Sequence, residues 1–186
     1  SSSDKCTLKK KPQASVSLHG DDYVAFDKFY LRRTGTRGAA VHLSGGADYN
    51  RFSSCIMEAN LSSTSSTLNP LVISSSATSV SGYGNNGNYN LFEDNDIRGG
   101  YYGVVNVGAS TTSMSEGNSF VRNNMNRAYY YGMRFYYVSG GVFHDNIIQD
   151  MRNAYNYGIY AYYVSNFDWQ RNKVIGAYYG NYFAYA

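Results

Sequence analysis

Phe120-Val121-Arg122-Asn123-Asn124-Met125 is the stretch that decides the fold, because its pattern returns along the chain. The pattern aromatic-x-x-Asn-x-aliphatic occurs four times in register, and two earlier segments keep the aromatic and aliphatic positions without the Asn. The aromatic residues that begin the six copies lie 23 to 40 residues apart and are Phe26, Phe52, Phe92, Phe120, Phe143 and Trp169. Four registered copies are difficult to obtain by chance, so the chain contains an internal repeat.

A second set of similar residues follows each Asn. The later copies are Tyr102-Gly103-Val104, Tyr131-Gly132-Met133, Tyr157-Gly158-Ile159 and Tyr179-Gly180-Asn181, and residues 38–41 and 71–73 are weaker equivalents. Each copy therefore contains two short β segments separated by turn residues, with no helical periodicity between them. A strand-only repeat of this size is one coil of a solenoid, so the sequence predicts an all-β solenoid of about six coils.

Four copies carry a resemblance to a known family: Phe92-Glu93-Asp94-Asn95-Asp96-Ile97, Phe120-Val121-Arg122-Asn123-Asn124-Met125, Phe143-His144-Asp145-Asn146-Ile147-Ile148 and Trp169-Gln170-Arg171-Asn172-Lys173-Val174. With them the chain resembles the right-handed parallel β-helix proteins, which include pectate-lyase-like enzymes and the shorter-repeat NosD-like proteins. The resemblance covers about residues 22–186 and implies a right-handed parallel β-helix there, with residues 1–21 as an N-terminal lead-in or partial coil. It does not specify an activity, because this fold hosts lyases, hydrolases, tailspikes and adhesins.

The Asn of each late copy predicts a structural ladder, formed by Asn95, Asn123, Asn146 and Asn172. Strands of successive coils lie about 4.8 Å apart, so equivalent side chains stack on one another. Asn tolerates a left-handed bend between two strands, and its amide can hydrogen-bond to the copies above and below. Cys55 occupies the same column, which favours a buried structural thiol; a disulfide with Cys6 and a reactive thiol are the alternatives.

Composition narrows the classes of function. The 186 residues include 21 Tyr, more aromatic side chains than a core needs, so many rings should lie near the surface. The net charge of +3 is too small to favour nucleic acid as a partner. No apolar run approaches the length of a membrane span, so insertion into a membrane is not expected. Residues 60–90 depart from the repeat and are rich in Ser, Gly and Asn, which predicts a protruding loop.

The acidic residues Glu93, Asp94 and Asp96 are the strongest candidates for chemistry, since lyases of the resembling family need clustered carboxylates for calcium. A structural reading competes with this one. The position two after the aromatic anchor alternates in sign in the late copies, which favours ion pairs between coils at Asp94, Arg122, Asp145 and Arg171. His19, His42 and His144 fall in different columns, so neither a metal site nor a catalytic triad is predicted, and no catalytic residue or cofactor is assigned.

A strip of tyrosines is the second candidate. Alternation along the strands places Val104, Met133 and Ile159 inside, which predicts that an outer strip is formed by Arg134, Tyr136, Tyr160, Tyr162 and Tyr182. Such a strip is suited to stacking against sugar rings or to contact with another protein, because rigid rings give contact area at low entropic cost. The Tyr residues before each Gly should stack as a further ladder.

These patterns predict a non-catalytic structural or adhesive β-helix module of a larger secreted or cell-surface protein, which contacts glycans through the tyrosine strip. A fragment of a polysaccharide lyase or glycoside hydrolase is the alternative, and a segment of a phage tail fibre or tailspike is the second. The chain stops inside a strand of the last copy, so the solenoid is expected to be incomplete or to be capped by another molecule stacked on its last coil. The expected location is extracellular or at the cell surface.

Overall fold

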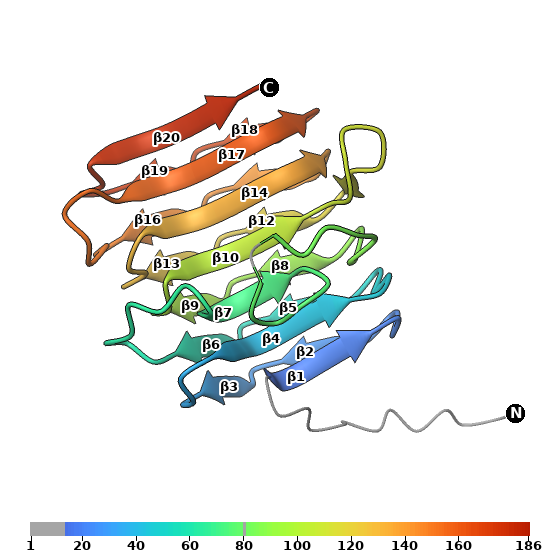
Figure 1. Ribbon diagram of the computed structural model, residues 1–186, viewed down its shortest axis with the longest axis horizontal. Helices are drawn as coiled ribbons and strands as arrows, with labels where there is room; N and C mark the ends of the chain where they lie inside the picture. Colours follow the sequence, from blue (N-terminus) through green and yellow to red (C-terminus); the bar gives the residue numbers. More distant parts are fainter. Residues whose placement is uncertain (1–13, 80) are drawn as a thin grey trace, which may run out of the picture.

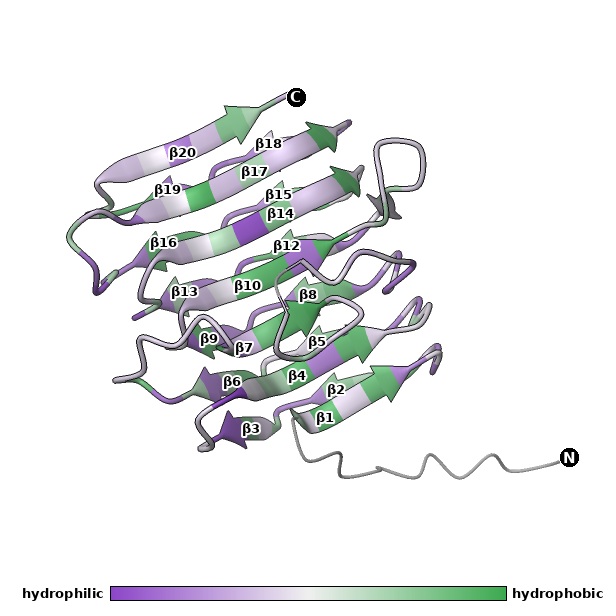
Figure 2. Ribbon diagram, viewed as in Figure 1, coloured by the Kyte–Doolittle hydropathy of each residue, from purple (hydrophilic) through white to green (hydrophobic). Residues whose placement is uncertain are grey.

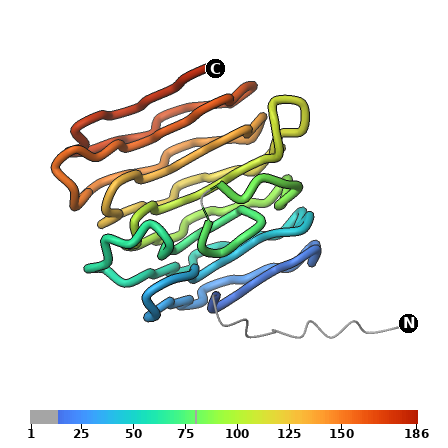
Figure 3. Tube along the Cα trace, in the orientation of Figure 1, coloured from blue at the N-terminus to red at the C-terminus, as the bar shows by residue number. Residues whose placement is uncertain are grey.

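The computed structural model describes residues 14–79 and 81–186, and in it the chain forms a right-handed parallel β-helix (Figure 1). Each turn of the chain lies on the one before it, as the Cα trace shows in Figure 3. Every named pair of strands is parallel, and the strands form three sheets that run along the axis of the solenoid. No helix in this part of the chain has the length and hydropathy needed to cross a membrane.

The long sheet carries seven stacked strands, one more than the six expected coils. They are β1 (Ala14–His19), β4 (Gly38–Ser44), β7 (Leu68–Ile73), β10 (Tyr102–Val107), β14 (Tyr131–Ser139), β17 (Tyr157–Ser165) and β20 (Tyr179–Ala184), with β11 (Ser115–Glu116) beside the end of β14. The extra strand is β1, which lies inside the segment expected as a lead-in over residues 1–21. Residues 1–13 of that lead-in lie outside the described residues.

The two other sheets have six short strands each and meet at a sharp corner. One contains β2 (Ala25–Asp27), β5 (Arg51–Ser53), β8 (Leu91–Glu93), β12 (Ser119–Val121), β15 (Val142–His144) and β18 (Asp168–Gln170). The other contains β3 (Tyr30–Arg33), β6 (Ile56–Ala59), β9 (Asp96–Arg98), β13 (Asn124–Asn126), β16 (Ile147–Gln149) and β19 (Lys173–Val174). The six aromatic anchors pair with one another in register along the first of these sheets.

The core is a stack of like side chains. Rings of the anchors lie face to face along the axis, with centroids 4.9 to 5.5 Å apart from Phe26 to Trp169. The aliphatic positions from Leu31 to Val174 stack in the same way on the neighbouring sheet. The third wall is lined by apolar side chains of the long sheet, such as Val104, Met133 and Ile159. The interior is therefore one continuous apolar column.

Asn side chains hold the corner between the two short-strand sheets. Oδ1 of Asn123 accepts hydrogen bonds from N and Nδ2 of Asn95, and Nδ2 of Asn123 donates to the carbonyl of Phe92 at 2.9 Å. Asn146 and Asn172 repeat the same contacts one and two coils further on. The amides thus satisfy backbone groups that the corner leaves without a strand partner, inside an apolar core where an unpaired group would be costly.

The left-handed backbone does not fall on these Asn residues, contrary to the expectation from the sequence. It falls on the residue before each of them, which is Asp94, Arg122, Asp145 or Arg171. Lys28 and Ser54 have the same positive φ at the equivalent positions of the first two copies. The physical reason is that two neighbouring residues have different roles at the corner. The exposed residue adopts the strained φ, while the Asn that follows turns its amide inward and bonds to the coils on both sides.

Cys55 takes the place of an Asn in this ladder. It is buried and free, its backbone N–H donates to Oδ1 of Asn95 at 2.9 Å, and its Sγ lies 3.5 Å from the carbonyl of Phe26. Burial raises the pKa of the thiol. The buried thiol agrees with the structural reading of this residue, whereas the other cysteine, Cys6, lies outside the described residues.

A second internal Asn ladder lies at the opposite end of the anchor strands and was not anticipated. It is formed by Asn50, Asn90 and Asn118, all fully buried, and each Oδ1 accepts a hydrogen bond from the backbone N–H of the preceding coil. The signal in the sequence is an Asn two residues before the anchor, as in Asn90-Leu91-Phe92. The two ladders together fix both ends of each anchor strand.

The segment expected as a protruding loop is divided by β7, and its second half folds back. Residues 74–79 and 81–90 cross the outer surface of the long sheet, where Ala77 packs with Val72, Val105 and Val107 in a second apolar cluster (Figure 1). The first half, residues 60–67, is also held against the solenoid. Arg152 donates hydrogen bonds to the carbonyl of Ser63 in this half and to that of Gly100. These strands carry Val on their outer side, and covering them removes that apolar surface from water.

Replacing Cys55 with Asn should extend the first ladder by one rung. The new Nδ2 would donate to the carbonyl of Phe26, as that of Asn95 does to Phe52 at 2.9 Å. We expect Cys55→Asn to raise the free energy of unfolding by about 1 kcal/mol, measured by urea denaturation. Cys55→Ala is the control and should lower it. A Cys55→Asn protein less stable than Cys55→Ala would contradict the role given to the ladder.

Candidate functional site

The outer surface of the long sheet changes character along the axis. In Figure 2 strands β7 and β10 are largely hydrophobic green, whereas β14, β17 and β20 have long pale and purple stretches. Those stretches contain tyrosines and glycines, together with Arg134 in β14 and Asn181 in β20. We call the outward tyrosines of β14, β17 and β20, together with Tyr102 of β10, the tyrosine face; they are Tyr102, Tyr131, Tyr136, Tyr157, Tyr160, Tyr162, Tyr179 and Tyr182. Beside this face, Ala77 covers Val105 and Val107 of the sheet.

The register brings the residues of the expected strip together. Arg134, Tyr160 and Tyr182 pair in one column, and Tyr136 and Tyr162 pair in the next. The guanidinium of Arg134 lies over the ring of Tyr136, 4.7 Å from its centroid, and 5.8 Å from that of Tyr102. Such cation–π contacts hold the cation among the rings.

The rings of this face cover one another. The ring of Tyr160 lies between those of Tyr131 and Tyr182, with centroids 4.9 and 5.0 Å away and planes inclined by 10° in both cases. Tyr136 and Tyr162 stack at 4.9 Å. A ring with neighbours on both faces shows the solvent its edge and its hydroxyl group. The face is therefore a row of phenol hydroxyls on a rigid sheet rather than a set of open ring faces.

Three phenols of this face, those of Tyr102, Tyr131 and Tyr162, have pKa values above the ordinary value for tyrosine. Burial among the other rings raises the pKa of Tyr131 and of Tyr102, and burial together with neighbouring phenols raises that of Tyr162. An uncharged phenol both donates and accepts a hydrogen bond. The arrangement is suited to a ligand rich in hydroxyl groups, and no nucleophile or carboxylate stands among the residues of the face.

The acidic residues considered for catalysis are all engaged by arginines. Asp94 receives two hydrogen bonds from Arg122, at 2.7 and 2.8 Å, and Asp96 receives two from Arg98, from its Nε at 2.7 Å and from its Nη2. Glu93 is paired with Arg51. Asp94 also occupies the corner between β8 and β9, so Glu93 and Asp96 belong to different sheets. The carboxylates form structural ion pairs in this arrangement, and Asp145 and Arg171 form another at 2.7 Å.

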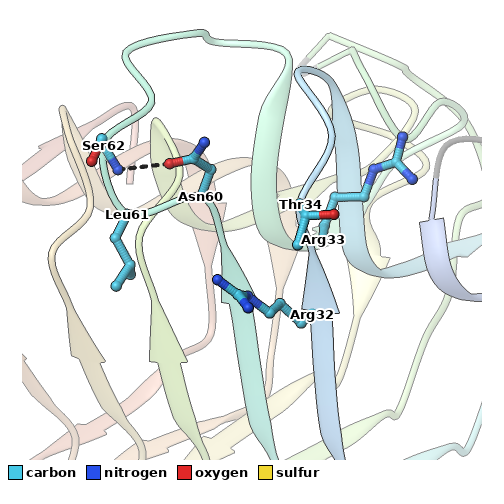
Figure 4. A pocket seen from close by; sticks show the side chains of 6 residues that line it. All are labelled: Arg32, Arg33, Thr34, Asn60, Leu61 and Ser62. Atoms are coloured by element: carbon cyan, nitrogen blue, oxygen red, sulfur yellow. Dashed lines mark hydrogen bonds between the residues drawn. The ribbon is translucent and has the colours of Figure 1, made fainter.

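A small pocket lies between the turns that follow β3 and β6 (Figure 4). Its volume is about 250 Å³, and it is lined by Arg32, Arg33, Thr34, Asn60, Leu61 and Ser62. The Nε of Arg32 is already bonded to buried Glu58 at 2.8 Å, and Ser62 donates its N–H to Oδ1 of Asn60. The lining is mostly polar and carries no carboxylate, which suits a small polar ligand.

The chain was compared with known proteins. The family described as "Periplasmic copper-binding protein (NosD)" matches residues 30–185, which is most of the chain. No curated protein and no solved structure matched.

The family's description names copper, so we asked whether side chains of this chain could bind that metal. The described His, Cys, Asp and Glu side chains do not form such a site. Copper in proteins is held by several His, Cys or Met side chains that converge. No three His, Cys, Asp or Glu side chains converge to hold a metal ion anywhere in residues 14–79 or 81–186. Nε2 of His42 is 2.8 Å from the carbonyl of Ser74, Nδ1 of His19 is 3.0 Å from Oγ of Ser44, and Nε2 of His144 is 3.0 Å from Asp168. Each histidine is thus engaged in its own column.

The ion pairs give the fold a defined dependence on pH. Hydrogen bonds from Arg122 and Arg171 lower the pKa of Asp94 and of Asp145. A carboxyl whose pKa is lowered in the folded state stabilises the fold above its unfolded pKa, about 3.9, and that contribution is lost as the pH falls through the folded value.

We therefore expect Arg122→Gln to reduce the fall in melting temperature between pH 6 and pH 2, relative to the unmodified protein. Thermal unfolding followed by circular dichroism over this range measures the effect. Arg37→Gln, on an exposed turn, is the control and should leave the pH profile unchanged. Parallel profiles for Arg122→Gln and the unmodified protein would show that the pair contributes nothing.

Proposed function

The chain belongs to the NosD family, and we propose that it is a non-catalytic β-helix module. We propose further that its tyrosine face binds an extended polysaccharide. The family is described as periplasmic, which supports a location outside the cytoplasm. The proposal includes the finer location, at the cell surface or in the extracellular space. The observation that carries the proposal is the row of stacked tyrosines along three successive strands of the rigid long sheet.

The geometry of the face favours a long ligand. Equivalent hydroxyls repeat with the separation of neighbouring strands, about 4.8 Å, along the axis of the solenoid. One sugar unit of an extended polysaccharide has a similar length, so successive sugars can meet successive tyrosines. Because the rings are stacked, contact is made through ring edges and hydroxyls, by hydrogen bonds to the hydroxyl groups of the sugars.

The chemistry of the face also supports binding rather than turnover. Its side chains are phenols and one guanidinium, which can orient a ligand, and the face carries no pair of carboxylates of the kind that most glycosidases use. The acidic residues that a lyase or a hydrolase would need lie on the other two sheets, where arginines pair with them. Arg134, between Tyr102 and Tyr136, adds a donor at the centre of the face.

Removing only the hydroxyls tests this mode of contact. The variant Tyr136→Phe, Tyr160→Phe, Tyr162→Phe, Tyr182→Phe keeps the stacked rings, so it should fold as the unmodified protein does. We expect its affinity for carbohydrate to fall by about tenfold or more, because several hydrogen bonds are lost. Binding is measured on a glycan microarray and by sedimentation with insoluble cellulose, chitin and peptidoglycan.

Replacing the same four tyrosines with Ser should abolish binding, and thermal unfolding will show whether that variant is folded. The matched control is Tyr23→Ser, Tyr49→Ser, Tyr89→Ser, which removes a stacked set elsewhere on the solenoid. Two results would overturn the proposal: no carbohydrate bound by the unmodified protein, or equal binding by the Phe variant and the unmodified protein.

A further inference from the structure

A second set of tyrosines stands on a corner of the solenoid away from the tyrosine face. Tyr23, Tyr49 and Tyr89 follow one another in adjacent coils, with ring centroids 5.1 and 5.2 Å apart and planes within 10° of parallel. They are exposed, Tyr23 by 76% and the other two by 47%. We call them the corner ladder. None of the three rings belongs to the apolar clusters of the described residues, although the ring of Tyr89 packs over Gly117.

The corner itself does not need tyrosine. The same backbone column continues through Gly117, Gly140 and Asn166, as the hydrogen bonds between coils show. All six residues of the column have φ between 55° and 66°. Gly and Asn adopt this left-handed conformation at low cost, whereas a bulky residue pays about 1–2 kcal/mol. The fold can therefore make this corner without Tyr, and three exposed rings are retained at a cost in stability.

The residues beside the corner ladder give it a negative charge. Asp22 and Asp48 immediately precede two of the tyrosines, Asp21 precedes Asp22, and Glu116 accepts a hydrogen bond from the hydroxyl of Tyr89 at 3.0 Å. Within residues 14–79 and 81–186, none of these four carboxylates has a cation within ion-pairing distance.

Acidic residues elsewhere on the solenoid behave differently. Lys or Arg side chains form ion pairs with Asp27, Glu58, Glu93, Asp94, Asp96 and Asp145, and His144 lies 3.0 Å from Asp168. Asp150 is the other described carboxylate with no such partner among the described residues. Within residues 14–79 and 81–186, carboxylates without an ion pair are thus concentrated on the corner that carries the exposed rings, which makes that corner complementary to a cationic partner.

We propose that the corner ladder and the carboxylates of Asp21, Asp22, Asp48 and Glu116 bind a lysine- and arginine-rich segment of another protein. The aliphatic stem of Lys or Arg packs on aromatic surface while its charged head reaches a carboxylate. The open outer face of Tyr23 accepts a cation directly. Carboxylates repeat over several coils, so the surface matches a chain with several positive charges. This site is independent of the carbohydrate proposed for the tyrosine face.

The backbone column of the corner ladder also contains Asn166, so Asn is a conservative substitution for its three tyrosines. Tyr23→Asn, Tyr49→Asn, Tyr89→Asn places in each coil the residue found at Asn166, so this variant should be at least as stable as the unmodified protein. Asp22→Asn, Asp48→Asn keeps the side-chain oxygen that accepts a backbone N–H, because Asn88 already does so in the next coil at 2.8 Å. The first variant removes the rings and the second removes charge, and both leave the backbone contacts in place.

Affinity for octalysine and octaarginine peptides is measured by fluorescence anisotropy, with octaglutamate and spermine as comparison ligands. We expect the peptides to bind the unmodified protein, and each variant to weaken that binding about tenfold. Tyr137→Asn, Tyr163→Asn changes two other left-handed tyrosines, and Asp94→Asn, Asp145→Asn changes two other acids; both controls should bind as the unmodified protein does.

The results of these binding experiments distinguish the ligands that could bind at the corner ladder. Equal binding by the Tyr→Asn variant and the unmodified protein would overturn the site, because attraction would then come from charge alone. Spermine binding as tightly as octalysine would replace the protein segment with a small polyamine. Self-association that is abolished by the same variants, seen by analytical ultracentrifugation, would make a second copy of this chain the occupant and would also overturn the proposal.

Discussion

The fold depends on the hydrogen bonds that buried Asn amides make at the ends of the anchor strands. At a corner of the solenoid the backbone leaves the strands, and its N–H and C=O groups lose their partners in an apolar interior. The side chain of Asn123 supplies partners on both sides: Oδ1 accepts from the N–H of Asn95 and Nδ2 donates to the carbonyl of Phe92 in the preceding coil, and Nδ2 also donates to Asn146 in the following coil. Since each amide requires its counterpart at a fixed distance, the ladders lock the register of all coils.

A locked register makes every outer column a stack of neighbours. Residues that are 22 to 40 positions apart in the chain come within contact distance, so a side chain meets the equivalent residue of the adjacent coil. Tyr160 therefore stacks on Tyr182, and Asp145 pairs with Arg171. Like residues repeated in sequence become ladders in space, and the chemistry of each outer surface is multiplied along the axis.

This rule explains how much the sequence could predict. Anything determined by period and alternation could be read from the residues: the solenoid, the stacked anchors from Phe26 to Trp169, and the neighbours of Arg134 within its column. Period alone does not determine ring orientation, so the covering of the ring faces in the tyrosine face was not foreseen. Nor does it determine the path of an irregular segment. Residues 74–79 fold back over the sheet because Val72, Val105 and Val107 offer apolar surface to cover.

Because equivalent residues of successive coils stack, the residues that the family's fold requires differ from those that determine the surface chemistry of this chain. Inner positions such as Asn123 and Phe92 are required by the solenoid, whereas outer columns are free to vary as long as stacked neighbours tolerate one another. A metal site on such a scaffold needs ligands in one column, or in adjacent columns of neighbouring coils, so that they converge. His19 faces Ser44, His42 faces Ser17 and Val72, and His144 faces Val121 and Gln170, so no histidine stacks on another. The described outer columns of the long sheet repeat tyrosine instead, so phenols are the groups that this surface presents in successive coils.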